Sequence, residues 1–260
     1  MSATAVSPDW LVLREPADAA ARSGELAARL ARHLPAGPLV IHDLGGGSGS
    51  MGRWLAPRLP GPQHWVVHDL DADLLALAAA VPAPSAPVTV EVRWSDIARL
   101  TPDDLAGASL VTASALLDLL TADELAGMLG ACVGRPMLLA LNVVGRVSLI
   151  PADPLDERIR AAFNAHQRRN GRLGPGAVAA AVAQLRGTAT EVLVRPSPWR
   201  LGPAHADLLA EWLDGWVAAA GEQEPALADA ACAYRDRRQA QAAAGELAVT
   251  VVHADLLVLP

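Results

Sequence analysis

Five of the eight residues from 45 to 52 are glycines, in the run GGGSGSMG. A short apolar segment at 38–44 comes directly before this run, and a helix-forming segment at 51–59 follows it. Glycine has no Cβ and adopts positive φ readily, so the chain can bend sharply here and a ligand can approach its backbone. The free N–H groups at a helix start point into the same space. Strand, bend and helix in this order predict an α/β fold with a ligand at the bend.

Apolar, β-branched segments alternate with helical segments through residue 150. The predicted strands are 38–44, 64–70, 88–94, 108–114 and 136–144. Helices are predicted between them at 51–59, 72–81 and 121–133. The last helix begins with a capping box, formed by Thr121 and Glu124. This alternation predicts a mostly parallel sheet with helices on both faces.

The two ends of the chain depart from this pattern. Leu26, Leu30 and Leu34 recur every fourth residue, which predicts one amphipathic helix at 17–34. The elements predicted in the second half are helices at 151–170, 174–187, 204–220 and 225–243, a sixth strand at 190–196 and a last strand within 246–260. We therefore expect one domain over residues 1–260, because 27.0 kDa suits a single elaborated core.

Acidic residues stand at the ends of the first two predicted strands. Asp43 precedes the first glycine of the bend, where a carboxylate suits the cationic ammonium of an amino acid; capping of the loop amides is the alternative role. Asp69 ends the second strand, at a spacing that suits hydrogen bonds from ribose hydroxyls. These two acids indicate a nucleoside ligand.

The glycines fit two patterns. Gly47-x-Gly49-x-x-Gly52 satisfies the dinucleotide fingerprint, which predicts an NAD(P)-dependent oxidoreductase. Gly45-x-Gly47-x-Gly49, preceded by Asp43, resembles motif I of class I S-adenosylmethionine-dependent methyltransferases of the small-molecule type. The acid favours the second pattern, because a carboxylate at this place repels a pyrophosphate.

The methyltransferase resemblance covers most of the chain and implies a fold and a donor site. The implied fold is a Rossmann-like three-layer α/β/α sandwich, whose seven-stranded, mostly parallel sheet has an antiparallel last strand beside strand six. Its parts are a helical lid at 1–37, a cofactor-binding core at 38–150, acceptor-site helices at 151–188, and C-terminal strands with a helical insertion at 189–260. Asp96 would accept a hydrogen bond from the adenine amino group, and the next N–H would serve a ring nitrogen. The implied donor-site residues are Asp43, Gly45, Gly46, Gly47, Gly49, Asp69, Leu70, Asp96, Ile97 and Ser114.

The resemblance also implies transfer of a methyl group from S-adenosylmethionine by in-line attack of an acceptor. Ligands of open α/β sheets bind outside the carboxyl ends of the strands. The residues predicted to bind the acceptor there, or from the lid, are Arg14, Asn142, Arg146, Asn164, Gln167, Trp199 and Arg200. The predicted catalytic residues are His166 and Asp118. A histidine suits a general base because its unperturbed pKa is near neutral, and Asp118 follows Ser114 by one helical turn. A solvated surface helix with an incidental histidine is the alternative for 163–168.

Composition restricts the partners. The formal net charge is −7, and all 21 basic residues are arginines, which disfavours nucleic acid and excludes lysine nucleophiles. We read no signal peptide at the start and no apolar run of about 18 residues, so no membrane association and a cytoplasmic location are expected. Cys132 and Cys232 are expected as free thiols, and no metal site is expected.

The remaining expectation is a small-molecule acceptor, with the oligomeric state left open and a homodimer as one alternative. A non-catalytic S-adenosylmethionine-binding protein is the other alternative function, and the intact glycine bend disfavours it.

Overall fold

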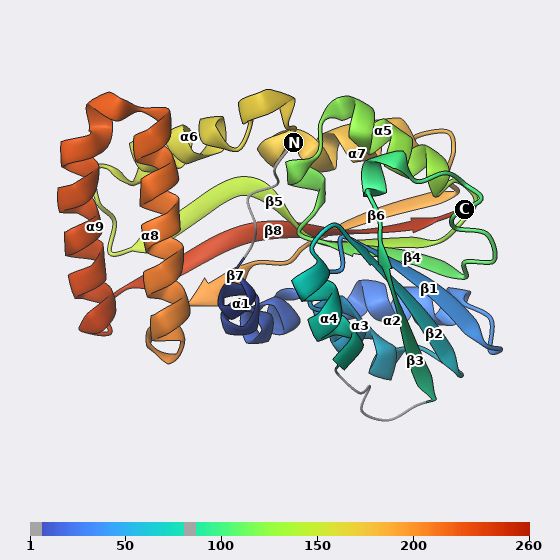
Figure 1. Cartoon of the computed structure of the whole chain (residues 1–260). Helices are drawn as coiled ribbons and strands as arrows, with labels where there is room; N and C mark the ends of the chain where they lie inside the picture. Colours follow the sequence, from blue (N-terminus) through green and yellow to red (C-terminus); the bar gives the residue numbers. More distant parts are fainter. Residues whose placement is uncertain (1–6, 81–86) are drawn as a thin grey trace.

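The computed structural model describes residues 7–80 and 87–260, and a twisted sheet runs through it (Figure 1). Within these residues the sheet has eight strands in the order β3-β2-β1-β4-β5-β8-β6, with β7 also paired to β8. The bounds are β1 Leu39–Leu44, β2 Gln63–Asp69, β3 Val88–Trp94, β4 Leu110–Ser114, β5 Met137–Ile150, β6 Glu191–Pro196, β7 Trp199–Leu201 and β8 Ala248–Leu259. The reading of the chain start as free of a signal peptide rests partly on residues 1–6, which lie outside the described residues.

The strand pairing confirms the predicted sheet and corrects its strand count. β1 to β5 pair in parallel, and β8 lies antiparallel between β5 and β6. The eighth strand is β7, in a segment that the sequence analysis left outside the strands. Pro196 and Pro198 come just before it and mask its strand character, because prolines near a short apolar run indicate a turn.

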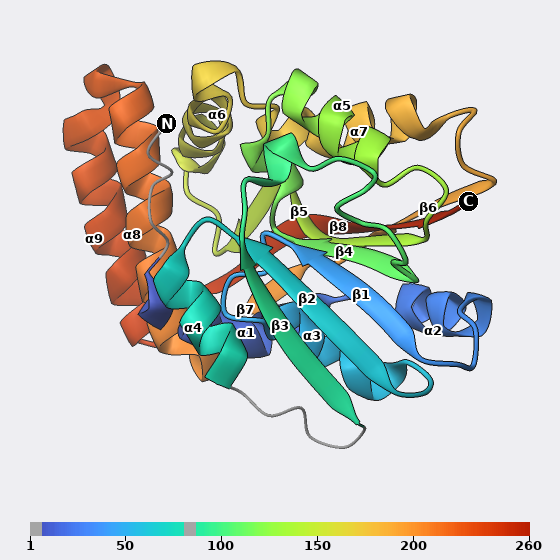
Figure 2. The same cartoon turned by 45° about the vertical axis from the view of Figure 1, so that its right-hand side comes forward.

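The described ranges contain nine α-helices. Their bounds are α1 Pro8–Ala21, α2 Gly24–His33, α3 Ser50–Leu55, α4 Ala72–Ala80, α5 Ala122–Ala131, α6 Asp156–His166, α7 Ala177–Leu185, α8 Ala206–Gln223 and α9 Ala228–Ala243. Helix α9 packs on the outside of α8. Helices α2 and α3 bury apolar side chains against one face, and α5 and α7 against the other. Figure 2 shows these two layers, so the predicted three-layer sandwich is confirmed. The predicted helix 72–81 ends at Ala80 in the described part, and Val81 lies outside it.

The predicted single helix at 17–34 is wrong: the chain forms two helices that meet at Arg22 and Ser23. The Ser23 side chain caps α2 by accepting a hydrogen bond from the Leu26 N–H at 3.3 Å. The Ser23 N–H donates to the Asp255 carboxylate at 2.7 Å. The break therefore depends on a partner in β8. Leu26 and Leu30 are fully buried, as their spacing predicts.

Strand β5 continues six residues past its predicted end at 144. Its pairing with β8 shifts register twice, between Leu139 and Asn142 and between Val143 and Arg146. Such bulges bend a strand and increase its twist. The bent extension of β5 and β8, with β7, packs against α1, α6 and α8 in a second apolar core. The extension therefore carries the C-terminal helices beyond the carboxyl ends of the parallel strands (Figure 1).

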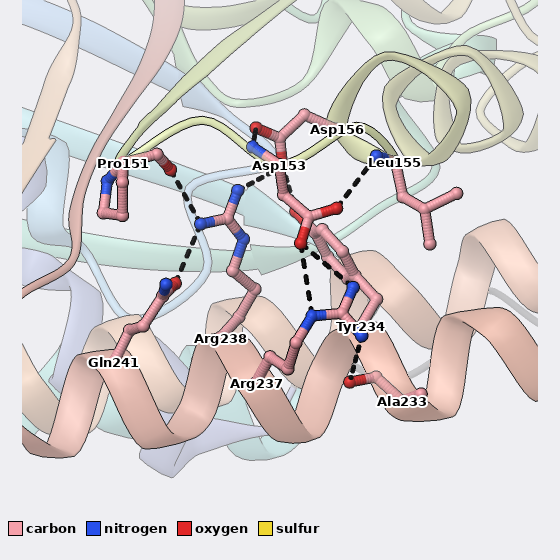
Figure 3. A network of polar contacts seen from close by, with 9 residues as sticks. All are labelled: Pro151, Asp153, Leu155, Asp156, Ala233, Tyr234, Arg237, Arg238 and Gln241. Carbon is pink, nitrogen blue, oxygen red and sulfur yellow. Dashed lines mark hydrogen bonds and ion pairs between the residues drawn. The ribbon is translucent and has the colours of Figure 1, made fainter.

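A polar network joins α9 to the loop between β5 and α6 (Figure 3). Arg238 is 1% exposed, and its guanidinium donates to the Asp156 carboxylate at 2.5 Å and to the Pro151 carbonyl at 2.7 Å. The Tyr234 hydroxyl donates to the same Asp156 oxygen at 2.6 Å. The neighbouring Arg237 is half exposed; it pairs with Asp153 at 3.0 Å and donates to the Ala233 carbonyl of its own helix at 3.1 Å. This network fastens α9 to the start of α6.

None of the helices in ranges 7–80 and 87–260 has the length and hydropathy to cross a bilayer.

Candidate functional site

The bend after β1 requires glycine for two reasons. Gly45, Gly47 and Gly49 have φ values of +61°, +53° and +82°, in the left-handed region that side chains disfavour. Gly46 has no room for a side chain, because a Cβ there would lie 2.6 Å from Asp43 Oδ2 and 2.7 Å from Val67 Cγ1. The Gly46 N–H donates to the His68 carbonyl at 3.1 Å, which holds the bend against β2.

Asp43 lies fully buried beneath this bend. Its Oδ1 accepts a hydrogen bond from the Thr112 hydroxyl at 2.6 Å, and its Oδ2 has no hydrogen-bond partner in the described part of the chain. Burial raises the pKa of Asp43 to about 7, against the smaller opposite effects of the Thr112 hydrogen bond and Arg22. An orphaned buried oxygen at the bend suits a cationic group of a ligand better than a second anion.

The other two predicted acids lie at the ends of β2 and β3, which are neighbours in the sheet. Asp69 Oδ2 accepts a hydrogen bond from the Gly47 N–H at 2.9 Å, which holds the bend, and its Oδ1 accepts from the Asp71 N–H at 3.0 Å. Each of these oxygens keeps a second lone pair for a ligand. Asp96 caps a short 3₁₀ helix by accepting from the Ala98 N–H at 3.0 Å, and its carboxylate is partly exposed. Leu70 and Ile97 follow these two acids in the chain, so the structure gathers all four at one edge of the bend.

Arg22 is the residue that the sequence analysis missed. It is buried, and its guanidinium donates at 3.1 Å to both the Ser50 hydroxyl, at the start of α3, and the Ser114 hydroxyl, at the end of β4. Its Nε has no partner among the described residues. Burial lowers the pKa of Arg22, and the nearby Asp18, Asp43 and Asp255 oppose this shift. Its sequence signal is weak: one arginine in the lid segment, directly before the capping serine.

Helix α1 lies over the bend, between α3 and α8 (Figure 2). Glu15 forms an ion pair with Arg53 of α3 at 2.5 Å, and Arg53 also donates to the Ser48 carbonyl in the bend at 2.6 Å. A Cβ at Gly47 would lie 3.6 Å from the Leu11 side chain. Helix α1 therefore contacts the glycine bend, and its role as a lid stays a prediction.

The same face of α1 also packs on Trp199 of β7, because Arg14 and Asp18 lie one helical turn from Leu11 and Glu15. The Trp199 indole donates to the Asp18 carboxylate at 2.9 Å, and Arg14 pairs with Asp18 at 2.9 Å while its guanidinium lies 5.1 Å from the Trp199 ring centre. Trp199 is only 3% exposed. Arg14 and Trp199 thus dock α1 onto the sheet, and their predicted contact with an acceptor stays a prediction.

His253 packs against Trp199 with ring centres 5.2 Å apart, and burial lowers the pKa of His253 to about 4. In the unfolded chain His253 binds a proton near pH 6.5, whereas in the folded chain it does so only near pH 4. The free energy of unfolding therefore falls as the pH drops from 6.5 to 4. We expect the unfolding free energy of His253→Phe, relative to the unaltered protein, to rise by about 3 kcal/mol between pH 7 and pH 4. Urea unfolding at both pH values measures this. The exposed His33→Gln variant is the control, and a pH-independent difference for His253→Phe contradicts the expectation.

Two predicted acceptor residues satisfy backbone groups of the strand extension. The Asn142 side chain donates to the Leu139 and Ala254 carbonyls at 2.9 and 3.1 Å, within the first bulge. The Asn164 side chain donates to the Gly145 carbonyl at 2.8 Å, and its Oδ1 is buried without a partner in the described ranges. These bonds give both side chains a structural role, and their contact with an acceptor stays a prediction.

Of the two predicted catalytic residues, His166 lies on a helix as expected and Asp118 does not lie on an α-helix. Asp118 lies in a 3₁₀ helix, Leu117–Leu119, so the expectation that it shares an α-helical face with Ser114 is wrong. Asp118 is buried, and burial raises its pKa. His166 ends α6, and its Nε2 lies 3.1 Å from the Glu222 carboxylate of α8, with Gln167 next to it. A catalytic role for either residue stays a prediction.

The structure brings two further predicted acceptor residues together. Arg146 of β5 and Arg200 of β7 line one groove of about 530 Å³ on the strand extension. The cavity beneath the bend, lined by Asp43 and Val67, is only about 30 Å³, which is room for a water molecule and no larger ligand.

No protein-family model and no curated protein matches the chain. Solved structures resemble it at low identity. A cyclopropane synthase from Mycobacterium tuberculosis is 14% identical with a TM-score of 0.49, over 97% of this chain and 94% of that one. A methyltransferase from Geobacter sulfurreducens, solved with S-adenosylhomocysteine, is 15% identical with a TM-score of 0.45, over 98% of both chains. The phosphoethanolamine N-methyltransferase 2 of Haemonchus contortus is 17% identical with a TM-score of 0.45, over 98% of this chain and 61% of that one.

These TM-scores are below 0.5, so we base the fold assignment on the sheet and the bend. The parallel strands lie in the order 3-2-1-4-5, as in doubly wound folds. The last strand lies antiparallel beside β6, and an acid-flanked glycine bend follows β1. These features give the chain a Rossmann-like α/β fold, as the resemblance to class I S-adenosylmethionine-dependent methyltransferases implies.

Proposed function

We propose that this chain binds S-adenosylmethionine at the glycine bend and transfers its methyl group to a small-molecule acceptor. One observation carries the proposal: the buried Asp43 carboxylate and the buried Arg22 guanidinium both lie at the bend. Asp43 Oδ2 and Arg22 Nε have no hydrogen-bond partner among the described residues. The amino-acid end of S-adenosylmethionine is a zwitterion, so it offers an ammonium to the first and a carboxylate to the second.

The amino-acid end, the ribose and the adenine of this cofactor would each contact different donor-site residues. Asp43 attracts the ammonium, and Arg22, held by the Ser50 and Ser114 hydroxyls, binds the carboxylate. Asp69 accepts from the ribose hydroxyls with its free lone pairs. Asp96 and the Ile97 N–H serve the adenine. When bound, S-adenosylmethionine supplies an electrophilic methyl group on a sulfonium.

The chain's contribution to the reaction is mainly positioning. Well-aligned reactants gain up to about 7–11 kcal/mol from being held together. The position of α1 over the bend excludes water from the bound donor. A general base is needed only where the acceptor loses a proton, and it then contributes about 10²–10⁴-fold. His166 and Asp118 are the candidates for that base.

Calorimetric titration with S-adenosylmethionine and with NADH tests the proposal against the oxidoreductase alternative. We expect binding of S-adenosylmethionine with one site per chain and no heat from NADH. Tight binding of NADH alone reverses the assignment. Transfer of a labelled methyl group from the donor into metabolites of a cell extract separates an enzyme from a non-catalytic binding protein.

Arg22→Gln tests the proposed carboxylate contact. We expect the affinity for S-adenosylmethionine to fall about 10- to 100-fold, because a hydrogen bond to a charged group contributes about 1.5–3 kcal/mol. The affinity for 5′-methylthioadenosine, which has the nucleoside and no amino-acid end, stays unchanged. Calorimetry on both ligands measures this.

The control for Arg22→Gln is Arg32→Gln, which removes an exposed arginine from α2. An equal loss of affinity for both ligands in Arg22→Gln indicates a purely structural arginine and contradicts the assignment.

A further inference from the structure

The groove on the strand extension is built by three adjacent strands. Arg146 pairs in register with Val252, and Arg200 with Thr250, on either side of β8. Thr250 and Val252 are two residues apart, so they share one face of β8. All four line the same groove, so the two arginines project from this face on both sides of β8.

The spacing of the two arginines suits one small ligand. They stand two strand spacings apart across the sheet and two residues apart along β8, roughly 12 Å in all. Their long side chains reach across part of that distance, so both guanidiniums can meet a ligand placed over β8. The volume of about 530 Å³ is within the range of small-molecule sites, about 300–1,000 Å³.

The charges in the groove are not balanced by the protein. Neither Arg146 nor Arg200 makes a side-chain hydrogen bond or ion pair with a residue of ranges 7–80 and 87–260, and none of the lining residues is acidic. Pairing is the rule nearby: Arg195 of β6 is bound to Glu25, and Arg29 of α2 to Glu191. Arg146 and Arg200 therefore line one groove whose described residues include no acid to neutralise them.

The groove is open to solvent, with Arg146 and Arg200 exposed, and its walls are largely apolar. Pro196, Pro198 and Val252 provide rigid apolar surface, and the Thr250 hydroxyl provides a neutral hydrogen-bonding group between the arginines. A few polar groups on an apolar surface are typical of a small-molecule site. Guanidinium binds carboxylates and phosphates through paired hydrogen bonds.

We propose that this groove binds a small molecule with two negative charges, a phosphate ester or a dicarboxylate, at a site distinct from the glycine bend. None of the bend residues lines the groove. The inference therefore does not depend on the proposed methyl transfer.

Calorimetric titration with inorganic phosphate and with succinate, at constant ionic strength, tests the groove. We expect one of the two probes to bind with one site per chain, and the probe that binds identifies the anion class. Arg146→Gln and Arg200→Gln each weaken that binding at least tenfold and leave the affinity for S-adenosylmethionine unchanged.

Arg186→Gln, at an exposed arginine after α7, is the matched control and keeps the unaltered affinity. Absence of binding by both probes overturns the inference. So does binding that Arg146→Gln and Arg200→Gln leave intact, or that Arg186→Gln weakens as much. If the unaltered protein does not bind S-adenosylmethionine, this result contradicts the proposed function and does not bear on the groove.

Discussion

Gly46→Ala is expected to lower the affinity for S-adenosylmethionine at least 100-fold. The added Cβ would lie 2.6 Å from Asp43 Oδ2 and 2.7 Å from Val67 Cγ1, and both side chains are buried in the sheet. The bend must therefore shift away from β2, and the Gly47 N–H would lose its bond to Asp69. Such overpacking also costs about 1–3 kcal/mol of stability. Calorimetry and urea unfolding measure the two effects.

Gly215→Ala is the control for this substitution. Gly215 lies in α8, where an added Cβ meets no other atom within 4 Å. We expect this variant to bind the donor as the unaltered protein does and to unfold at equal or higher urea concentration. Unaltered donor affinity in Gly46→Ala contradicts the assignment of the site to the bend.

Arg238→Met is expected to lower the free energy of unfolding by about 3–5 kcal/mol, because it leaves the Asp156 carboxylate without its buried cation. It also removes the donor to the Pro151 carbonyl. Urea unfolding measures the loss. Arg237→Met, on the same helix, is the matched control: it breaks an ion pair whose arginine is half exposed, so we expect at most about 1 kcal/mol.

Equal and small losses in both variants contradict the account of α9 as fastened by the buried network. The double variant Arg238→Met/Asp156→Asn separates charge from packing. Because it removes both charges, we expect it to regain part of the stability that the single Arg238→Met variant loses.

Local patterns in the sequence are sufficient for the core of the fold. The alternating segments locate β1 to β5, and the capping box at Thr121 and Glu124 forms as expected. The buried leucines of α2 follow their four-residue spacing. Each of these features depends on neighbours in the chain, which a pattern can register.

The features that the sequence analysis missed depend on distant partners. Ser23 separates α1 from α2 because its N–H bonds Asp255, 232 residues away. Asp255 also accepts from the Leu141 N–H at 2.7 Å and the Ser197 hydroxyl at 2.5 Å, which fixes the first bulge of β5 next to the turn into β7. Burial of Arg22 requires Ser50 and Ser114 from two other elements. No local pattern encodes these contacts.

The structure of the chain with S-adenosylhomocysteine tests the central claim most directly. The account predicts the amino-acid end of this ligand between Asp43 and Arg22, its ribose at Asp69 and its adenine beside Asp96. A glycine bend that stays empty at saturating ligand, or one that takes up the pyrophosphate of a dinucleotide instead, would contradict it.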